Sequence, residues 1–267
     1  MTDVVIAGAA GRMGSRLVAL LQGDGTLRLV AALEAPGHAA LGKDAGEVAG
    51  VGRLEIPISA DADGALGGDR ILIEFSVPEA SLAHLRVLAR KGGRAVIGTT
   101  GFSAAEKDEV ERLAKTVPIL LSPNMSVAVN VAFRVLADVA RMLGDEYDVE
   151  ITETHHRFKK DAPSGTALKM AEVVAQSLGR DLGKHAVYGR HGLPGERTRT
   201  EIGVLSLRSG DVVGEHTVSF GALGERLEVT HRAHSRDTFA RGALRAARFI
   251  ATARPGLYSM QDVLQFS

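Results

Sequence analysis

The chain has 267 residues, 45% hydrophobic and 24% charged, which suits one or two domains with a sizeable core and excludes wholesale disorder. Its formal net charge is zero, which argues against a general binder of nucleic acid or membrane surfaces, because both need positive charge to meet phosphates. Cysteine is absent, so disulfides, thiolate metal sites and cysteine nucleophiles are excluded.

Short apolar runs alternate with helical patterns in the first half of the chain. Strands are expected at residues 4–7, 27–33, 71–75, 95–97 and 119–121, and helices at residues 12–22, 78–90 and 103–115. Pro78 suits the first turn of its helix, and Ser103 with Glu106 forms a capping-box pattern. Strands and helices that alternate at this spacing predict parallel βαβ units.

The second half of the chain is richer in strands. Helices are expected at residues 127–143, 164–178 and 238–252, and strands at residues 149–153, 203–207, 212–220 and 227–231. Turn-like segments at 209–211 and 222–225 separate the last three strands, so these strands are expected to be antiparallel neighbours. The last helix is expected to pack against the first domain.

Together these elements predict the α/β class with two domains. A Rossmann-type, doubly wound parallel sheet is expected in a dinucleotide-binding domain of residues 1–126 and 236–267. A smaller α+β domain with a mixed, largely antiparallel sheet is expected in residues 127–235. No apolar run reaches the ~18 residues that a membrane-spanning helix needs.

A glycine-rich loop, GAAGRMG at residues 8–14, joins the first strand to the first helix. In a parallel α/β fold, Gly8 at this position allows a tight turn, Gly11 lets the backbone approach a pyrophosphate, and Gly14 permits close helix–strand packing. The helix N-terminus offers N–H groups and a partial positive charge to the phosphates. On its own the pattern also fits an ordinary glycine-rich turn, because the chain contains 31 glycines.

Glu34 ends the second strand, where an acid hydrogen-bonds the ribose hydroxyls of a dinucleotide. Its carboxylate would repel an added 2′-phosphate, although it could also be a solvated loop acid. Two further polar turns, GTTG at residues 98–101 and SPNM at residues 122–125, follow strands at the same predicted sheet edge. The loop, the acid and the βαβ context together predict a site for a nicotinamide-type dinucleotide.

The segment ETHHRFKKDAPSGTA at residues 153–167 is the most informative part of the chain. Five of the six residues from His155 to Lys160 can carry positive charge, and they precede a predicted helix start at Ser164. Positive side chains beside a helix N-terminus favour an anion, here a small acidic substrate with more than one carboxylate. Neighbouring cations lower the pKa of histidine and lysine, so the segment can also move protons near neutral pH.

Three other interpretations of this segment stay open from its residues alone. It could be a solvated basic loop, a metal site built on the paired histidines, or a nucleic-acid patch. No residue at ligand spacing completes a metal site, and zero net charge with 4% aromatic residues disfavours nucleic acid. His231 and His234 are interpreted as a histidine at a strand end and a histidine in a loop.

From residue 5 to about residue 264, the chain resembles the dihydrodipicolinate reductase family. The most specific likeness is segment 153–167, which is similar to the family signature E-x-H-H-x-x-K-x-D-x-P-S-G-T-A. The loop at 8–14, the run VIGTTGF at 96–102 and GEH at 214–216 also resemble the family.

The resemblance implies a Rossmann domain for the dinucleotide and a second domain that binds substrate and forms a homotetramer. It implies hydride transfer from NADH or NADPH to a cyclic dicarboxylate imine in the diaminopimelate route to lysine; no metal is expected. His155 is then expected to donate and accept a proton, and Lys159 to donate one. The expected substrate-binding residues are His156, Lys159, Gly165 and Thr166. The expected cofactor-binding residues are Gly8, Ala9, Ala10, Gly11, Arg12, Met13, Glu34, Gly98, Thr99, Thr100, Ser122, Pro123, Asn124 and Met125.

Coenzyme preference depends on the residue that follows Glu34. Many members of the family have arginine there, which can pair with the 2′-phosphate of NADPH, whereas this chain has Ala35. NADH is therefore the expected coenzyme, with some use of NADPH through Arg12.

The lack of cysteine, of a membrane-length apolar run and of a basic signal-peptide start favours a cytoplasmic enzyme. Its expected partner is a small cyclic dicarboxylate, with neither nucleic acid nor membrane. Two alternatives are a small NAD-dependent dehydrogenase resembling aspartate dehydrogenase, and a non-catalytic regulator that senses a dinucleotide. The first would lack the run from Lys159 to Thr166, and the second would need a partner- or DNA-binding module.

Overall fold

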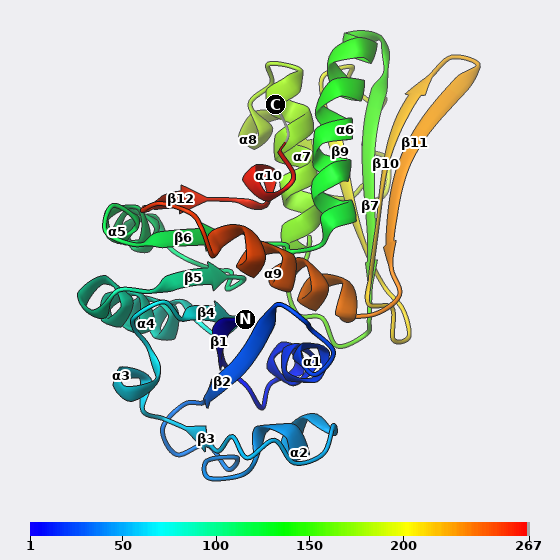
Figure 1. Ribbon diagram of the computed structural model, residues 1–267. Helices are drawn as coiled ribbons and strands as arrows, with labels where there is room; N and C mark the ends of the chain where they lie inside the picture. Colours follow the sequence, from blue (N-terminus) through cyan, green and yellow to red (C-terminus); the bar gives the residue numbers. More distant parts are fainter. Residues whose placement is uncertain (266–267) are drawn as a thin grey trace. The chain divides into compact units, whose positions relative to one another are not determined.

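In the computed structural model, residues 1–265 are described and form two compact units (Figure 1). One unit comprises Met1–Val127 together with the C-terminal segment that begins at Arg236, and the other comprises Ala128–Ser235. The last long helix therefore belongs to the same unit as the N-terminal half. Within the described residues, no helix has the length and apolar character needed to cross a bilayer.

The first unit contains a seven-stranded sheet in the order β12-β6-β5-β4-β1-β2-β3. Its strands are β1 (Thr2–Ala7), β2 (Leu27–Leu33), β3 (Ile58–Ser59), β4 (Ile71–Glu74), β5 (Arg94–Ile97), β6 (Pro118–Leu121) and β12 (Gly256–Tyr258). Every neighbouring pair is parallel, which confirms the predicted sheet. The edge strands β3 and β12 were not predicted, because two or three residues are too few to show a strand period.

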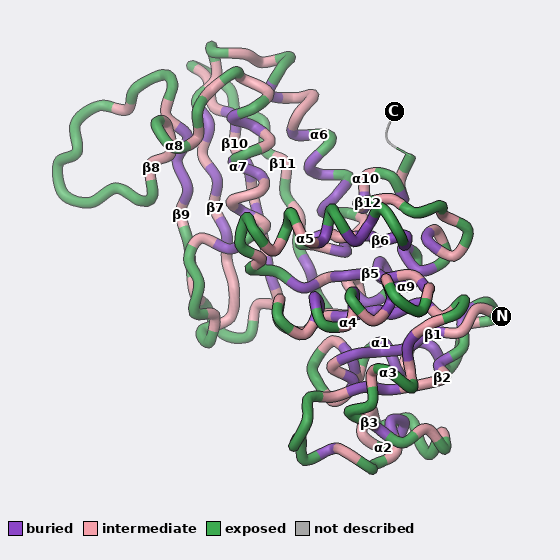
Figure 2. Tube along the Cα trace, turned by 90° about the vertical axis from the view of Figure 1, so that its left-hand side faces the viewer, coloured by how far each residue is buried: buried purple, intermediate pink, exposed green. Residues whose placement is uncertain are grey.

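Helices cover both faces of this sheet. They are α1 (Arg12–Leu21), α2 (Ala45–Ala49), α3 (Ala62–Ala65), α4 (Pro78–Lys91), α5 (Ala104–Ala114), α9 (Asp237–Ile250) and α10 (Met260–Val263). Alternate residues of β1 lie in two different cores, one shared with α1 and α9 and the other with α4 and α5. Figure 2 shows the buried central strands of this sheet. Burial on both faces explains why these strands are continuous apolar runs in the sequence.

Local signals set the helix boundaries in this unit. Pro78 is the first residue of α4, and Gly92 ends that helix with a φ of 79°. The capping box predicted at Ser103 is present: its hydroxyl accepts from the N–H of Glu106, whose side chain accepts from the N–H of Ser103. These boundaries were predictable because each depends on residues within one helical turn.

The second unit contains a five-stranded sheet in the order β11-β10-β7-β9-β8. Its strands are β7 (Asp148–His155), β8 (Ala186–Val187), β9 (Ile202–Arg208), β10 (Gly214–Ala222) and β11 (Glu225–Ala233). Its helices are α7 (Gly165–Ser177), α8 (Leu182–His185) and α6 (Val127–Leu143), which begins at the boundary and is followed by a 3-10 turn at Gly144–Glu146. β10 is antiparallel to β7 and β11, whereas β9 is parallel to β7 and β8. The sheet is mixed, as predicted, but its β9 side is parallel.

The predicted order of these strands is wrong at one place. Strands 203–207 and 212–220 were expected to be direct neighbours, yet β7 lies between β9 and β10 and pairs with both. Turn residues at 209–211 let the chain reverse, but they do not determine whether a third strand lies in between. The predicted turn between β10 and β11 is confirmed, since Ala222 pairs with Glu225 and Gly224 has a φ of 93°.

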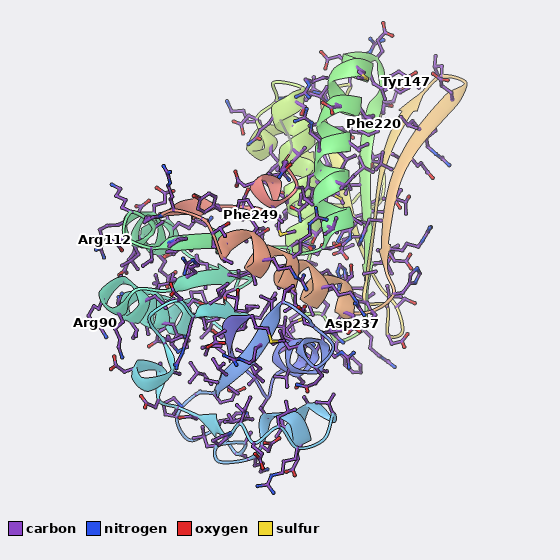
Figure 3. All side chains as sticks on the ribbon, viewed as in Figure 1. Arg90, Arg112, Tyr147, Phe220, Asp237 and Phe249 are labelled. Carbon is purple, nitrogen blue, oxygen red and sulfur yellow. The ribbon has the colours of Figure 1, made fainter. Side chains whose placement is uncertain are left out.

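Helices α6 and α7 pack against one face of the mixed sheet. Phe220 of β10, labelled in Figure 3, lies in the core that these helices form with the sheet. Thr217 lies on the opposite face, because side chains alternate along a strand. By the same alternation, Glu153, His155 and His216 lie on the face that α6 and α7 cover.

Candidate functional site

The loop between β1 and α1 is a tight glycine turn that brings the helix against the strand. Gly8 has a φ of 69°, a conformation that favours glycine. A Cβ on Gly14 would lie 2.0 Å from the carbonyl oxygen of Gly8, so only glycine allows this close approach. A Cβ on Gly11 would lie 3.1 Å from the same oxygen. These are the features expected of a loop whose backbone contacts a pyrophosphate.

The N-terminus of α1 presents backbone N–H groups rather than side-chain caps. Its N-cap residue is Gly11, and within the described chain no side chain caps this end of the helix or adds an acid to its first turn. Arg12 is exposed in that first turn. The N–H groups and the positive end of the helix dipole together favour an anion.

Glu34 lies against this loop. Its Oε1 accepts the N–H of Ala10 at 2.9 Å, and its Oε2 accepts the N–H of Ala35 at 3.2 Å. The parallel pairing of β1 with β2 therefore brings the predicted acid to the predicted loop.

The turns after β5 and β6 lie at the same edge of the sheet, because all these strands are parallel. A Cβ on Gly98 would lie 2.1 Å from the ring of Phe75, so glycine is needed there. Thr99 is buried, and its hydroxyl accepts from the N–H of Ser76 at 3.1 Å and the hydroxyl of Ser81 at 2.9 Å. The Thr99 side chain thus stabilises the turn.

The turn at residues 122–125 is also held by its own side chains. The hydroxyl of Ser122 donates to the carbonyl of Asn124 at 2.9 Å, and Oδ1 of Asn124 accepts the N–H of Ser126 at 2.9 Å. Contacts with a dinucleotide at these two turns are therefore expected mainly from the backbone. In these two turns, Thr100 and Pro123 are exposed and Met125 is buried. Ala9 of the glycine loop is also buried.

In the second unit, the basic segment follows directly from β7, and His155 is the last residue of that strand. Its Nδ1 lies 2.5 Å from Oε2 of Glu153, two residues earlier on the same face. Glu153 is fully buried. Arg208 of the neighbouring strand β9 donates to both of its carboxylate oxygens, at 2.9 and 3.0 Å.

Burial is the largest influence on the pKa of both His155 and Glu153. It lowers the pKa of His155, and the charges of Lys159 and Arg208 lower it further. The carboxylate of Glu153 raises the pKa of His155 but does not reverse the shift. Burial would raise the pKa of Glu153, yet hydrogen bonds from Arg208, His155 and Ser206 outweigh it, so that this pKa is lowered. The predicted direction for His155 is confirmed, although desolvation rather than neighbouring cations is its main cause.

Lys159 lies in the loop between β7 and α7. Its Nζ is 2.8 Å from both carboxylate oxygens of Asp161, whose side chain is 63% exposed. His156 of the same loop has a buried Nδ1 with no hydrogen-bond partner among the described residues. Its ring centroid is 6.3 Å from that of Phe158. The loop therefore presents Lys159 in an ion pair with an exposed acid.

Ser164 connects the start of α7 to this cluster. Its hydroxyl accepts a backbone N–H from the first turn of α7 at 3.1 Å, and its own N–H donates to Oε1 of Glu153 at 3.1 Å. Gly165 and Thr166 are the first two residues of the helix, and a Cβ on Gly165 would meet no atom within 4 Å. The predicted anion-binding end of α7 thus lies beside the acid that contacts His155.

His216 of β10 packs beside His155, with ring centroids 5.1 Å apart. Its Nε2 is 2.9 Å from the hydroxyl of Ser164. Burial lowers the pKa of His216 to about 3, so this histidine is neutral at pH 7. His231 lies in β11 opposite His216, and His234 follows that strand.

Four residues of this cluster were not among the predicted site residues: Glu153, Ser164, Arg208 and His216. Ser164 was predicted only as the start of a helix. A signal existed for Glu153, because residues two apart on a strand share a face. Arg208 and His216 come from strands whose order the sequence did not show. Among the described residues, no cluster of three histidine or acidic side chains could hold a metal.

Comparisons with known proteins cover both units. The model of the dihydrodipicolinate reductase N-terminus matches residues 2–125, and the model of its C-terminus matches residues 128–264. A 4-hydroxy-tetrahydrodipicolinate reductase of Syntrophus aciditrophicus is 53% identical over 100% of this chain and 99% of its own. One of Citrifermentans bemidjiense is 52% identical, over 99% of each chain.

Solved structures agree with the fold. A dipicolinate-bound dihydrodipicolinate reductase from Paenisporosarcina sp. TG-14 is similar with a TM-score of 0.72 and 22% identity, over 98% of each chain. An amine dehydrogenase from Mycobacterium smegmatis is similar with a TM-score of 0.61 and 15% identity, over 97% of this chain and 95% of its own. At these identities the likeness concerns the fold alone.

The family models and the curated relatives carry the same assignment over nearly the whole chain. This assignment replaces the alternatives of an aspartate-dehydrogenase-like enzyme and a non-catalytic regulator. Two matched domain models and relatives above 50% identity show that the chain belongs to the dihydrodipicolinate reductase family.

Proposed function

We propose that this chain reduces 4-hydroxy-tetrahydrodipicolinate, through its dehydrated cyclic imine, with a nicotinamide dinucleotide as hydride donor. Family membership makes the chain an oxidoreductase of the diaminopimelate route to lysine. The observation that carries the residue assignment is that His155 and Lys159 lie beside the N-terminus of α7, in a segment similar to the family signature. Positive side chains and helix N–H groups both favour a small diacid there.

We assign the dinucleotide to the first unit, at residues 8–13, Glu34, and the turns at 98–100 and 122–125. These residues fit a dinucleotide, because Gly11 and Gly14 have no Cβ atom and so let the loop and α1 pack closely. Glu34 stands at the end of β2, held by a loop N–H, where ribose hydroxyls bind in this fold class. When bound, the nicotinamide supplies the hydride.

We assign the substrate carboxylates to His156, Lys159, Gly165 and Thr166. Asp161 holds Lys159 only through a surface ion pair, a weak contact that a substrate carboxylate can replace. Space is open at Gly165, and the N–H groups of the first turn of α7 can donate to a carboxylate.

We assign proton transfer to His155 and Lys159. Hydride addition to the imine leaves negative charge on the nitrogen-conjugated system, and one proton from a positioned acid completes the reduction. The side chains of His155 and Lys159 are 12% and 19% exposed, so each retains contact with solvent and is accessible to a small ligand. General acid catalysis of this kind contributes about 10²–10⁴ in rate.

NADH is the preferred coenzyme in this proposal, and NADPH is used less well through Arg12. The carboxylate of Glu34 repels a 2′-phosphate, and Ala35 offers it no positive charge. We expect kcat/KM to be about tenfold higher with NADH, a difference of roughly 1.4 kcal/mol. Steady-state kinetics with each coenzyme measure the ratio, and a clear preference for NADPH would contradict this assignment.

We further propose a homotetramer formed through the second unit, located in the cytoplasm. The sheet face opposite α6 and α7 carries Leu207, which is 55% exposed within one chain. Contact with another copy across this face would remove the side chain of Leu207 from water, which is favourable. The lack of cysteine favours a reducing compartment, and cell fractionation tests that location.

The direct test of the activity follows NADH absorbance with enzymatically generated substrate. We expect NADH oxidation that requires the substrate, and competitive inhibition by dipicolinate, a planar analogue of the diacid. No oxidation with either coenzyme would contradict the proposal. Oxidation of aspartate with NAD in place of imine reduction would instead support the dehydrogenase alternative.

A further inference from the structure

Glu153 is a fully buried carboxylate that receives hydrogen bonds from several directions. Its Oε1 accepts from Nη2 of Arg208 at 3.0 Å and from the N–H of Ser164 at 3.1 Å. Its Oε2 accepts from Nη1 of Arg208 at 2.9 Å and lies 2.5 Å from Nδ1 of His155. Arginine and backbone N–H groups can only donate, so the carboxylate acts as an ionised acceptor.

This geometry determines which nitrogen of His155 carries the proton. At 2.5 Å from a carboxylate oxygen, Nδ1 must be the donor, because neutral imidazole has one N–H and one lone pair. The lone pair of neutral His155 therefore lies on Nε2. When His155 is charged, the proton it can give away is also on Nε2.

We propose that Glu153 is a positioning residue for the reduction: it holds His155 through Nδ1, so that Nε2 is the nitrogen that exchanges a proton with the substrate. This inference rests on the proposed function, since it requires His155 to be the acid and base. It assigns to Glu153 a role through His155 rather than a contact with substrate.

The opposite strand keeps Nε2 clear. A Cβ on Gly214 of β10 would lie 3.0 Å from Nε2 of His155. Gly214 does not have a positive φ, so its backbone conformation does not require glycine. Glycine is favoured at this position because a side chain would occupy the space beside Nε2. The glycine of the GEH run thus leaves room at the nitrogen that Glu153 leaves unpaired.

The charges around His155 oppose its protonation, except for Glu153. Lys159 from the loop and Arg208 from β9 both lower its pKa, and His216 from β10 is neutral at pH 7. Glu153 is the group that raises the pKa. Its removal should therefore lower the pKa of His155, in addition to releasing the ring from its orientation.

The variant Glu153→Gln tests the proposal with little change of shape. On the Oε1 side the amide NH2 group would meet two donors, Nη2 of Arg208 and the N–H of Ser164, whereas on the Oε2 side it meets one, Nη1 of Arg208. We therefore expect the NH2 group to replace Oε2 and to face His155, at the loss of one hydrogen bond from Arg208. Nδ1 must then accept, which moves the proton of neutral His155 to Nε2. The remaining carbonyl oxygen still accepts from Ser164, so the start of α7 should be retained.

We expect Glu153→Gln to lower kcat about a hundredfold, the order of a lost general acid, with the KM for substrate and for NADH unchanged. The fall in rate towards high pH should begin at lower pH, because the pKa of His155 is lower. Glu109→Gln is the matched control, since Glu109 is also held by a bidentate arginine but contacts no histidine. Its kinetics should match those of the unchanged protein. A rise in both KM values with an unshifted pH profile would assign Glu153 a purely structural role and overturn the proposal.

His155→Gln, alone and combined with Glu153→Gln, separates this inference from the proposed function. If Glu153 acts through His155, adding Glu153→Gln to His155→Gln should reduce kcat no further. Multiplicative losses in the double variant would overturn the role of Glu153 while leaving His155 in place. Full activity of His155→Gln alone would instead refute the proposed function of His155.

A measurement on the unchanged protein covers the case in which Glu153→Gln does not fold. Nitrogen-15 NMR of the histidines distinguishes the two neutral tautomers, and the spectrum of His155→Gln identifies the signal. We expect the proton of neutral His155 on Nδ1. A proton on Nε2 would overturn the proposal.

Discussion

At the scale of single residues, Lys159 combines a positive charge with an exchangeable proton. Lys159→Ala removes both, so we expect kcat to fall by about 10²–10⁴ and the KM for substrate to rise. The loop between β1 and α1 is untouched, so the Kd for NADH should not change. Steady-state kinetics and a fluorescence titration with NADH measure these quantities.

Lys160→Ala is the matched control, because Lys160 is the adjacent lysine and is exposed. We expect it to keep the kinetics of the unchanged protein. A loss of NADH binding in Lys159→Ala as large as its loss of substrate binding would show that the assignment of the two ligands to separate units is wrong.

His216 predicts a pH dependence of stability. Burial lowers its pKa in the folded protein to about 3, below its ordinary value of 6.5, so the unfolded chain binds the proton more readily. Its contribution to the free energy of unfolding is therefore complete above pH 6.5 and is lost as pH falls from 6.5 towards about 3.

His216→Gln keeps a donor near the position of Nε2 but cannot titrate. Relative to this variant, the unchanged protein should lose about 1.4 kcal/mol per pH unit below pH 6.5. Urea unfolding at several pH values between 7 and about 4.5 measures the difference. Equal slopes for both proteins would show that His216 does not titrate in this range on unfolding.

At the scale of elements, the junction of β1 and α1 depends on a glycine that its neighbours require. Gly14→Ala would place a Cβ 2.0 Å from the carbonyl oxygen of Gly8, so α1 must shift. We expect a loss of about 1–3 kcal/mol in the free energy of unfolding, as for other overpacked sites. The Kd for NADH should rise with it, because the loop and the helix N-terminus move together.

Gly23→Ala controls for the general effect of replacing glycine, since a Cβ on Gly23 would meet no atom within 4 Å. Denaturant unfolding and NADH titration of both variants test the claim. If Gly14→Ala has the same stability and the same Kd for NADH as Gly23→Ala, the claim that α1 must shift is wrong.

The same scale shows which elements the sequence could predict. The capping box at Ser103 and the proline start of α4 were predictable, because their signals are local. Strand β9 was predicted, but its neighbour in the sheet was not. The turn residues at 209–211 do not indicate that β7 lies between β9 and β10. The pairing of distant strands is decided by side-chain packing over the whole sheet.

At the scale of the whole molecule, we expect four copies to assemble through the uncovered face of the mixed sheet. Thr217 and Thr230 lie opposite each other on that face, with their hydroxyl oxygens 3.0 Å apart. Thr217→Arg would place a positive charge there, and we expect the mass measured by light scattering to fall below that of four chains. Asp108→Arg, an exposed position in α5, should leave the mass unchanged. A monomer in the unchanged protein would contradict the proposed tetramer.

The basic segment was recognisable because its residues lie close together along the chain. His155, His156 and Lys159 lie within five positions and precede the cap residue Ser164, so their chemistry could be predicted without any tertiary contact. Arg208 lies more than fifty positions from Glu153 along the chain, and only the parallel pairing of β7 with β9 brings its guanidinium to that carboxylate.

The sequence alone determined the two kinds of sheet, the glycine loop with its acid and the basic segment before α7, since each depends on residues that are near one another along the chain. The tertiary structure decided what surrounds those groups: which strands flank β7, which guanidinium binds the carboxylate of Glu153 and which histidine is buried. These properties arise from desolvation and from hydrogen bonds between distant strands, and both exist only after the core has formed.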